Sequence, residues 1–516
     1  MTGSKVPAAI DIGSRRELFV EASLVDQLKG KAELRLHHPV PQEIVLLHDA
    51  PWEGNGSDYH SIFQDGGRYR MYYSARQIVV SPGKIDANVH QHFLCYAESN
   101  DGIGWRKPQL GLHEFNGSKA NNIVVVSGPS GRLKIATETP AVFKDENPNA
   151  APDARYKAFL GSKEPRGLLA FKSPDGIHWS PMDDSPIITD GAFDSQNVAF
   201  WDGLRGEYRA YWRYFTRGSA ASPHVGVRAI HTATSKDFLR WENQVTVGYF
   251  DSPAEHLYTN QVKPYHRAPH LFVGFPTRYI ERELKAGELD DARAPAGPEK
   301  TRHWSPSTRA LPELEHRELR ASASERYGTA LTEGLIMASR DGVNFKRWQE
   351  AFLRPGIERE GTWNYGHQFI GWHLVETRSR LEGAPDELSL YAGESYWTGD
   401  SSALRRYSLR LDGFVSVRAP MSGGELITKP LRFRGRKLTL NFATSAAGSL
   451  QVEIQDGSGK ALPGFAQADC PPVFGDTLER TVTWRNGRDV GSVAGQTVQL
   501  RIVLKDADLF SFRFTE

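Results

Sequence analysis

A hairpin pattern that recurs along the chain constrains the fold more than any other feature of the sequence. In its clearest copy, an acidic residue precedes the alternating apolar run 195–201, Asp202-Gly203 follows, and 207–212 is a second, aromatic-rich run. Alternating runs on both sides of an Asp-Gly turn predict a β-hairpin. Comparable pairs of runs occupy 59–73, 141–160, 261–275 and 369–392. We therefore predict a chain built mainly from repeated hairpins.

A second element follows four of these hairpins. It begins at a serine, continues with Asp two positions later, and reaches Trp or Phe six positions after the serine; the copies start at Ser99, Ser173, Ser235 and Ser339. In three copies Gly follows the Asp and can adopt positive φ, while the Asp bonds backbone amides. A unit of about four strands leaves an apolar face uncovered unless its neighbours pack radially against it. The sequence therefore predicts an all-β fold, a five-bladed β-propeller followed by a β-sandwich.

The domain boundaries follow from where the repeat starts and stops. We expect residues 1–48 to be an N-terminal lead-in packed on the propeller, 49–419 to be the propeller, and 420–516 to be a C-terminal β-sandwich of short strands. The charged stretch at about 281–326 interrupts blade four and is predicted to be a partly helical insertion. Such insertions often line the entrance to a site or contact another subunit, so a homo-oligomer is left open.

Composition narrows the class of partner. The formal net charge is +1 and the charged residues are not gathered in a basic stripe, which argues against nucleic acid. No apolar run is long enough to span a membrane, and residues 1–10 lack a secretory apolar core; a trimmed signal peptide and the native compartment are left open. Cys95 and Cys470 are expected to be buried thiols. The 12 Trp and 18 Tyr suit carbohydrate stacking as well as core packing.

The candidate catalytic residues are acids that precede the inner strands. The inner strands of a propeller converge on a central funnel. In four blades a carboxylate precedes the inner strand, and these acids are Asp58, Glu138, Asp194 and Glu255. Carboxylates that share a half-buried funnel acquire different pKa values, so one can act as acid and another as base or nucleophile. Hydrolysis of a glycosidic bond needs such a pair. A single acid before a strand is more often a turn or cap residue, so the prediction depends on the coincidence of four of them.

Other polar and aromatic residues near the strand starts are candidates for substrate binding. Those expected to bond sugar hydroxyls are His60, Gln196, Asn197, Tyr258, Asn260 and His367. Arg213 and Arg278 could bind a carboxylate or sulfate on the sugar, or form ion pairs at blade ends. Trp52, Trp363 and Tyr365 could stack on a sugar ring or pack at the rim. The histidines show no metal-binding spacing, so no cofactor is expected to be required, although a structural calcium in the channel is left open.

The first inner hairpin, Asp58-Tyr-His-Ser-Ile-Phe with Tyr69-Arg-Met-Tyr-Tyr, and its echo around Asp194 resemble the five-bladed β-propeller glycoside hydrolases related to families 43, 32, 68 and 117. The resemblance implies a base or nucleophile at Asp58, a pKa-tuning acid at Glu138 and a general acid at Asp194, with Glu255 or Glu333 as alternative acids. The chain lacks the Arg-Asp-Pro and Glu-Cys motifs of ordinary invertases, so it resembles an outlying member of this superfamily.

The function predicted from these features is cleavage of a terminal glycosidic bond in an oligo- or polysaccharide. Two alternatives are a non-catalytic carbohydrate-binding propeller and a glycoside phosphorylase, which would need a phosphate pocket of Arg, Lys and His. A sialidase-like enzyme ranks lower, because that class needs six blades and a cluster of three arginines, and the sequence shows five blades and no evident arginine cluster.

Overall fold

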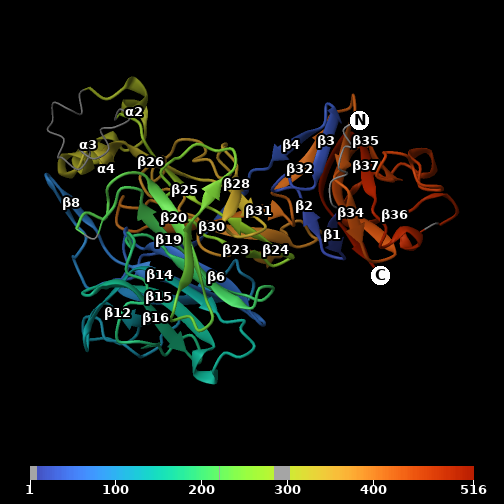
Figure 1. Ribbon diagram of the computed structural model, residues 1–516. Helices are drawn as coiled ribbons and strands as arrows, with labels where there is room; N and C mark the ends of the chain where they lie inside the picture. Colours follow the sequence, from blue (N-terminus) through green and yellow to red (C-terminus); the bar gives the residue numbers. More distant parts are fainter. Residues whose placement is uncertain (1–8, 220, 284–302, 488) are drawn as a thin grey trace.

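The computed structural model describes residues 9–219, 221–283, 303–487 and 489–516, and its larger part is a ring of five small antiparallel sheets (Figure 1). Blades one and two each follow the chain outward from an inner strand. Blade one contains β6 (Asp58–Asp65), β7 (Arg68–Ala75), β10 (Phe93–Ser99) and β11 (Trp105–Arg106), with β12 (Ile123–Val126) also paired to β10. Blade two contains β13 (Gly128–Ser130), β14 (Leu133–Lys144), β15 (Tyr156–Lys163), β16 (Arg166–Ser173) and β17 (Ser180–Pro181).

The next two blades repeat this order. Blade three contains β18 (Val198–Asp202), β19 (Glu207–Phe215), β20 (Arg228–Ser235) and β21 (Glu242–Thr246). Blade four contains β23 (Lys263–Tyr265), β24 (Ala268–Gly274), β27 (Met337–Ser339) and β28 (Asn344–Arg347), with β22 (Gly248–Tyr249) parallel to β28. The five-bladed propeller predicted from the repeated hairpins is confirmed.

Blade five closes the ring with a strand from the start of the chain. Its first three strands are β29 (Val375–Thr377), β30 (Glu387–Glu394) and β31 (Ala403–Arg410). The fourth is β5 (Val40–Leu47), which pairs antiparallel with β31 so that Leu47 lies opposite Ala403. The ring is therefore closed by hydrogen bonds between segments from opposite ends of the propeller sequence.

The four turns that begin at Ser99, Ser173, Ser235 and Ser339, which we call the serine turns, join neighbouring blades. In the first copy, the Ser99 hydroxyl accepts from the Gly102 amide at 2.9 Å, and Asp101 Oδ1 accepts from the Ile103 amide at 2.8 Å. The Gly102 carbonyl then accepts from the hydroxyl of Tyr391 in blade five. Two more tyrosines repeat this contact: Tyr72 donates to the Gly176 carbonyl at 3.0 Å and Tyr211 to the Gly342 carbonyl at 2.7 Å.

The variant copy at Ser235 replaces both members of this contact. Phe238 stands where the other turns have Gly, with φ 71°, and is fully buried. Phe159 of blade two stands where the other blades have the donating tyrosine, and the two rings stack at 5.2 Å between centroids. An apolar pair therefore takes the place of the tyrosine-to-carbonyl hydrogen bond at this one interface.

The C-terminal unit is a single hydrogen-bonded network of eight strands. Its long strands β35 (Lys437–Gln455) and β37 (Gln499–Thr515) pair along their length with a register shift between Thr444 and Ser449. The other C-terminal members are β32 (Val415–Ala419), β33 (Gly424–Thr428) and β36 (Asp476–Val482). Alternating buried side chains in both long strands supply its core. The packing of two separate sheets as a sandwich stays a prediction.

The N-terminal strands complete this unit (Figure 1). They are β1 (Ile10–Gly13), β2 (Glu17–Leu18), β3 (Val25–Gly30) and β4 (Glu33–Leu36), and they pair with β34 (Leu431–Phe433), β37, β33 and β32 in that order. The sequence analysis placed all of residues 1–48 on the propeller as a lead-in. The strand pairing differs because the open strand edges that need partners lie in the C-terminal unit and in blade five.

Asp412 joins the two units. Its buried carboxylate accepts hydrogen bonds from Arg16 at 3.1 Å, Arg267 at 2.9 Å, Tyr265 at 2.8 Å and Ser511 at 3.0 Å. Burial acts to raise the pKa of Asp412, but the charges of Arg16 and Arg267 hold it below the usual range. The joint therefore depends on one ionised carboxylate with donors from both units.

The described part of the blade-four insertion is helical. It contains α2 (Pro306–Ala310), α3 (Leu314–Ala323) and α4 (Arg326–Thr329), between the ribbon strands β25 (Thr277–Glu281) and β26 (Ala330–Gly334). Residues 284–302 lie outside the described residues. Helix α3 contacts the hairpin of β8 (Val79–Ser81) and β9 (Lys84–Asp86), which extends from blade one (Figure 1). None of the helices in the described ranges is long and apolar enough to cross a membrane.

Candidate functional site

Side chains from all five blades line one hollow, which we call the funnel cavity. Its main part has a volume of about 420 Å³, and a connected part of about 400 Å³ shares Asp194 and Tyr258 with it. The polar and aromatic lining includes Tyr59 and Arg76 of blade one, Glu138 and Lys163 of blade two, Asp194, Arg213, His224 and Arg228 of blade three, Tyr258, Arg326 and Tyr327 of blade four, and Tyr365, Tyr396 and Trp397 of blade five. The inner strands therefore converge on a common site.

Glu138 reaches the cavity from an interruption in β14. The pairing of β14 with β15 is broken between Ala136 and Ala141, which frees the intervening residues from the ladder. The Glu138 carboxylate lies 3.0 Å from His92 Nδ1 and 2.6 Å from Lys163 Nζ. Burial acts to raise its pKa, but these two partners lower the pKa of Glu138 to about 2. Glu138 is therefore ionised throughout the neutral range.

Asp194 stands just before β18 and faces the cavity. Its side chain is 60% exposed and forms an ion pair with Arg213, while His224 Nε2 lies 3.1 Å from Oδ1. The surrounding protein acts to raise its pKa, but Arg213 and His224 hold the pKa of Asp194 well below its usual range. The backbone amide of Arg213 donates to Asn197 Oδ1 at 2.9 Å, so Asn197 fixes the strand that carries the cation.

Asp58 lies beneath the cavity floor rather than on its surface. The residue is 2% exposed, its Oδ1 accepts from the Tyr59 amide at 2.7 Å, and its Oδ2 has no hydrogen-bond partner among the described residues. Burial raises the pKa of Asp58 to about 7, against the smaller effects of that amide and of Arg76. Asp58 is thus the carboxyl here that holds a proton near neutral pH, whereas the resemblance implied a base.

A layer of buried polar groups supports the floor. His60 Nε2 lies 3.0 Å from His48 Nε2, and burial lowers the pKa of His60 to about 3. Gln196 donates to the carbonyls of Tyr59 at 2.9 Å and Pro140 at 2.7 Å, and accepts from Gln261 at 2.5 Å. These side chains bond protein groups at the propeller axis, so their role here is to hold the blades together.

The axis offers amides rather than a set of carboxylates. No group of three or more His, Cys, Asp or Glu that could hold a metal ion is present in the described part of the chain. Gln196 and Gln261 occupy the centre with their amides engaged by one another and by backbone carbonyls. The structural calcium left open from the sequence stays untested, and we assign no step to a metal.

The walls of the cavity are aromatic. The hydroxyls of Tyr258 and Tyr365 lie 2.7 Å apart, and the Tyr59 ring stacks on Phe369 at 5.8 Å between centroids. Tyr396 and Trp397 add a second stacked pair at 5.5 Å. Flat aromatic faces beside carboxylates are the surfaces on which sugar rings pack.

Several predicted site residues lie elsewhere. Arg278 pairs with Glu333 at 2.8 Å across β25 and β26 and lies 3.4 Å from Glu255, which also pairs with Arg347, so these acids and Arg278 form a separate ion network. This is the ion-pair alternative for Arg278. The remaining four bond local protein groups: Trp52 to Asn122, Trp363 to the Gly356 carbonyl, His367 to the Trp363 amide, and Asn260 to the Val262 amide.

Most of the cations that line the funnel cavity are not among the residues predicted from the sequence. Arg76 follows β7 directly, Lys163 ends β15, and Arg228 begins β20. In an antiparallel hairpin the end of the second strand lies beside the start of the first, so these cations lie at the same end of the blades as the predicted acids. A search of second-strand ends would have found Arg76 and Lys163. Arg326 could not be found this way, because it comes from the insertion.

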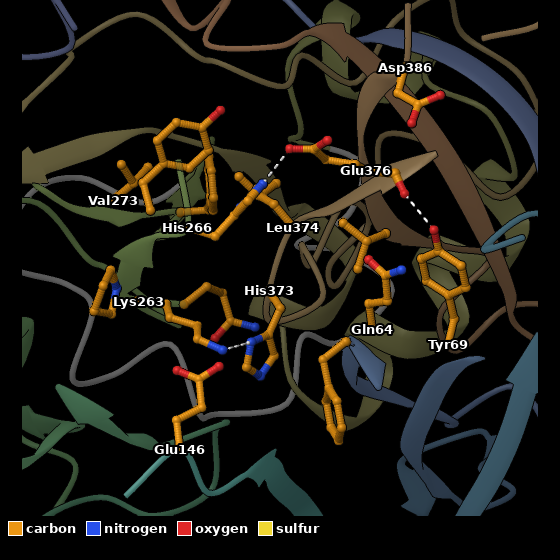
Figure 2. Close-up of a pocket in the computed structure, with 16 residues that line it drawn as sticks. Gln64, Tyr69, Glu146, Lys263, His266, Val273, His373, Leu374, Glu376 and Asp386 are labelled. Carbon is orange, nitrogen blue, oxygen red and sulfur yellow. Dashed lines mark hydrogen bonds and ion pairs between the residues drawn. The ribbon is translucent and has the colours of Figure 1, made fainter. Parts of the chain in front are cut away.

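A second cavity of about 530 Å³ lies among blades one, two, four and five (Figure 2). Lys263 Nζ lies 2.8 Å from His373 Nδ1, and Figure 2 shows Glu146 beside this pair. Burial lowers the pKa of Lys263, although the charge of Glu146 opposes the shift. Gln261 lines this cavity and bonds Gln196, which bonds the Tyr59 carbonyl, so the axial amides lie between the two hollows.

Comparisons with known proteins add similarities in fold. No protein-family model and no curated protein matches the sequence. Similar solved structures include a family 32 β-fructofuranosidase from Bombyx mori, with 10% identity, coverage of 93% of this chain and 94% of that chain, and a TM-score of 0.36. An endo-arabinase from Bacteroides thetaiotaomicron has 11% identity, coverage of 71% and 98%, and a TM-score of 0.37.

A third similar structure belongs to an enzyme of a different class. It is an N-acetylgalactosamine deacetylase from F. plautii in complex with blood group B trisaccharide, with 13% identity, coverage of 74% of this chain and 94% of that chain, and a TM-score of 0.40. These scores are too low to carry an argument about function. The fold assignment therefore rests on the strand pairing of this chain, and the function on its cavity.

Proposed function

We propose that the chain is a glycoside hydrolase that removes a terminal sugar from an oligo- or polysaccharide. The observation that carries the proposal is the funnel cavity, where Glu138 and Asp194 face one hollow with aromatic walls and Asp58 lies below Tyr59. Hydrolysis of a glycosidic bond needs one carboxyl that is protonated and one that is ionised. The pKa of Asp58, at about 7, and that of Glu138, at about 2, provide this contrast.

The carboxyl groups take different parts in the proposed reaction. Glu138 and Asp194 are ionised and line the cavity, so either can act as the base that takes a proton from an attacking water, or as a nucleophile whose glycosyl intermediate water then hydrolyses. Asp58 is suited by its pKa to be the source of the proton that the leaving oxygen needs; because it lies beneath the floor at Tyr59, this proton has to reach the cavity through a group that lines it. Arg76 couples the two carboxyls electrostatically, because its charge acts to lower the pKa of Asp58 and it also interacts with the charge of Glu138. The aromatic walls would position the sugar.

Conservative amide substitutions test this proposal. Asp58→Asn, Glu138→Gln and Asp194→Asn should each lower kcat/KM by ~100-fold or more on the aryl glycoside or oligosaccharide that the native protein cleaves. Glu333→Gln is the matched control, because Glu333 belongs to the ion network of Arg278 outside the cavity lining. Full activity in all three variants would overturn the assignment, and loss of activity in the control would show that the substitutions act through the fold rather than through the site.

The alternative of a non-catalytic binding propeller predicts a different outcome. It would retain oligosaccharides in a binding assay and release no product from any of them, and the three amide substitutions would alter affinity alone. Product analysis by chromatography on the native protein separates the two functions directly.

A further inference from the structure

Three arginines gather in the part of the funnel cavity that lies beside blade three. Arg213, Arg228 and Arg326 line this hollow of about 400 Å³ together with His224 and a single carboxylate, Asp194. Arg213 is 2% exposed and Arg228 is 7% exposed, so the protein rather than water surrounds two of the charges. Among these lining residues, the guanidinium groups outnumber the carboxylate three to one.

Aromatic rings hold the guanidinium groups. The Arg228 carbon Cζ lies 4.1 Å from the centre of the Tyr279 ring, Arg213 lies 4.8 Å from the Tyr258 ring, and Arg326 lies 4.3 Å from the Tyr327 ring. A ring face orients a guanidinium group without using its N–H donors. The buried Nε atoms of all three arginines have no hydrogen-bond partner within the described ranges.

Among the three arginines, Arg228 has the least compensated positive charge, because its pKa alone is lowered while those of Arg213 and Arg326 are raised. Asp194 pairs with Arg213, and Arg228 Nη1 lies 3.1 Å from His256 Nδ1. The charges of Arg326 and Arg228 act to lower the pKa of Glu281, but burial outweighs them and raises it. Burial and the charges of Arg213 and Arg326 together lower the pKa of Arg228. Like charges held this close in a buried site cost free energy unless an anion joins them.

We infer that this arginine pocket binds an oxyanion carried by the substrate, a carboxylate or sulfate group on the sugar. The inference rests on the proposed function and names its substrate class. Arginine forks bind planar and tetrahedral oxyanions through paired N–H bonds. The pocket opens into the cavity that contains Glu138 and shares Asp194 and Tyr258 with it, so one ligand can place its anion here and its glycosidic bond beside the carboxylates.

Calorimetric titration tests this inference without turnover. The Glu138→Gln protein is titrated with oligosaccharides that end in a uronic acid, in a sulfated sugar or in the matching neutral sugar. We expect at least one anionic ligand to bind ~10-fold or more tightly than its neutral counterpart, with the difference shrinking as salt is raised. Equal affinity for anionic and neutral members of every pair would overturn the inference.

Substitutions then locate the effect. Arg228→Gln and Arg326→Gln should each remove the preference for the anionic ligand, and Arg228→Lys, which keeps the charge but loses the fork, should retain only part of it. Arg278→Gln is the control, since Arg278 lies on β25 and belongs to the separate ion network with Glu255 and Glu333. Circular dichroism confirms that each variant is folded. An unchanged preference in Arg228→Lys and in both Gln variants would contradict the assignment.

Inorganic phosphate is the other source of an oxyanion. If free phosphate is the ligand, it should raise the turnover of a neutral sugar and appear in the product as a sugar phosphate, and this result would overturn the substrate-borne anion. The outcomes also separate the two proposals. Anion-dependent binding without any product would contradict the hydrolase function and support the arginine pocket. Hydrolysis of neutral sugars alone would support the hydrolase function and contradict the arginine pocket.

Discussion

Asp58 is the proposed source of the catalytic proton, and protein atoms enclose its carboxyl group closely. A Cβ placed on Gly393 would lie 3.1 Å from Asp58 Oδ2. Backbone therefore approaches the carboxyl from one side, while the Tyr59 amide binds it from another. This enclosure explains why the carboxyl keeps its proton while two neighbouring blades present ionised carboxylates.

The pH dependence of activity should report Asp58. If the acid function requires its proton, kcat/KM should fall as the pH rises through about 7. Glu138, with a pKa of about 2, should set no limit above pH 4. The measurement is a pH–rate profile on the native protein, with stability checked at each pH. Activity that stays constant from pH 5 to pH 9 would exclude Asp58 as the acid.

The pH dependence of the unfolding free energy should also reflect the raised pKa of Asp58. Because the pKa of Asp58 is raised by folding, the folded state binds a proton more tightly than the unfolded state, so stability falls as pH rises from about 4 to about 7. Asp58→Asn should flatten this part of the curve of unfolding free energy against pH, measured in urea. An equally steep curve in the variant would place the pH dependence elsewhere.

At the scale of elements, the serine turns are contacts between blades rather than simple chain reversals. A Cβ on Gly342 would meet the Tyr211 hydroxyl at 2.8 Å and Phe272 at 2.9 Å, and its φ is +75°. A Cβ on Gly66, whose φ is +63°, would meet no heavy atom of the described chain within 4 Å. The two glycines share a backbone conformation and differ in what surrounds them.

This difference gives a matched experiment. Gly342→Ala should destabilise the protein more than Gly66→Ala, because both pay for positive φ and only the first also displaces the neighbouring blade. Tyr211→Phe, which removes the hydrogen bond to the Gly342 carbonyl, should cost about 1 kcal/mol. Denaturant unfolding measures all three. Equal losses for the two alanine variants would show that the turn does not join the blades.

At the scale of the whole molecule, the sequence predicted the repeat but not all of its partners. The turns beginning at Ser99, Ser173, Ser235 and Ser339 identified the blades, because turn chemistry is local. The strands at 10–36 and 40–47 pair with segments that lie between about 350 and about 500 residues away, and alternation predicts a strand without identifying its neighbour. Of the acids predicted to share a funnel, Glu138 and Asp194 line one cavity, whereas Glu255 turns toward Arg347.

Truncation tests this long-range pairing. A chain of residues 49–419, the predicted propeller, lacks β5 and leaves the edge of β31 open, so it should aggregate or remain unfolded. A chain of residues 38–419 keeps β5 and should show more native-like secondary structure and less aggregation. Circular dichroism and size-exclusion chromatography compare the two. Identical behaviour would mean that β5 is dispensable for the ring.

Ring closure by β5 also has a consequence for synthesis. The ribosome releases residues 40–47 long before β31 exists, and β1–β4 likewise precede every C-terminal strand with which they pair. For most of translation, the leading segment therefore has no partner, while the blades behind it can already form their hairpins. Completion of the fold therefore waits until β31 and the C-terminal strands have been synthesised, and until then residues 10–47 present unpaired strand edges.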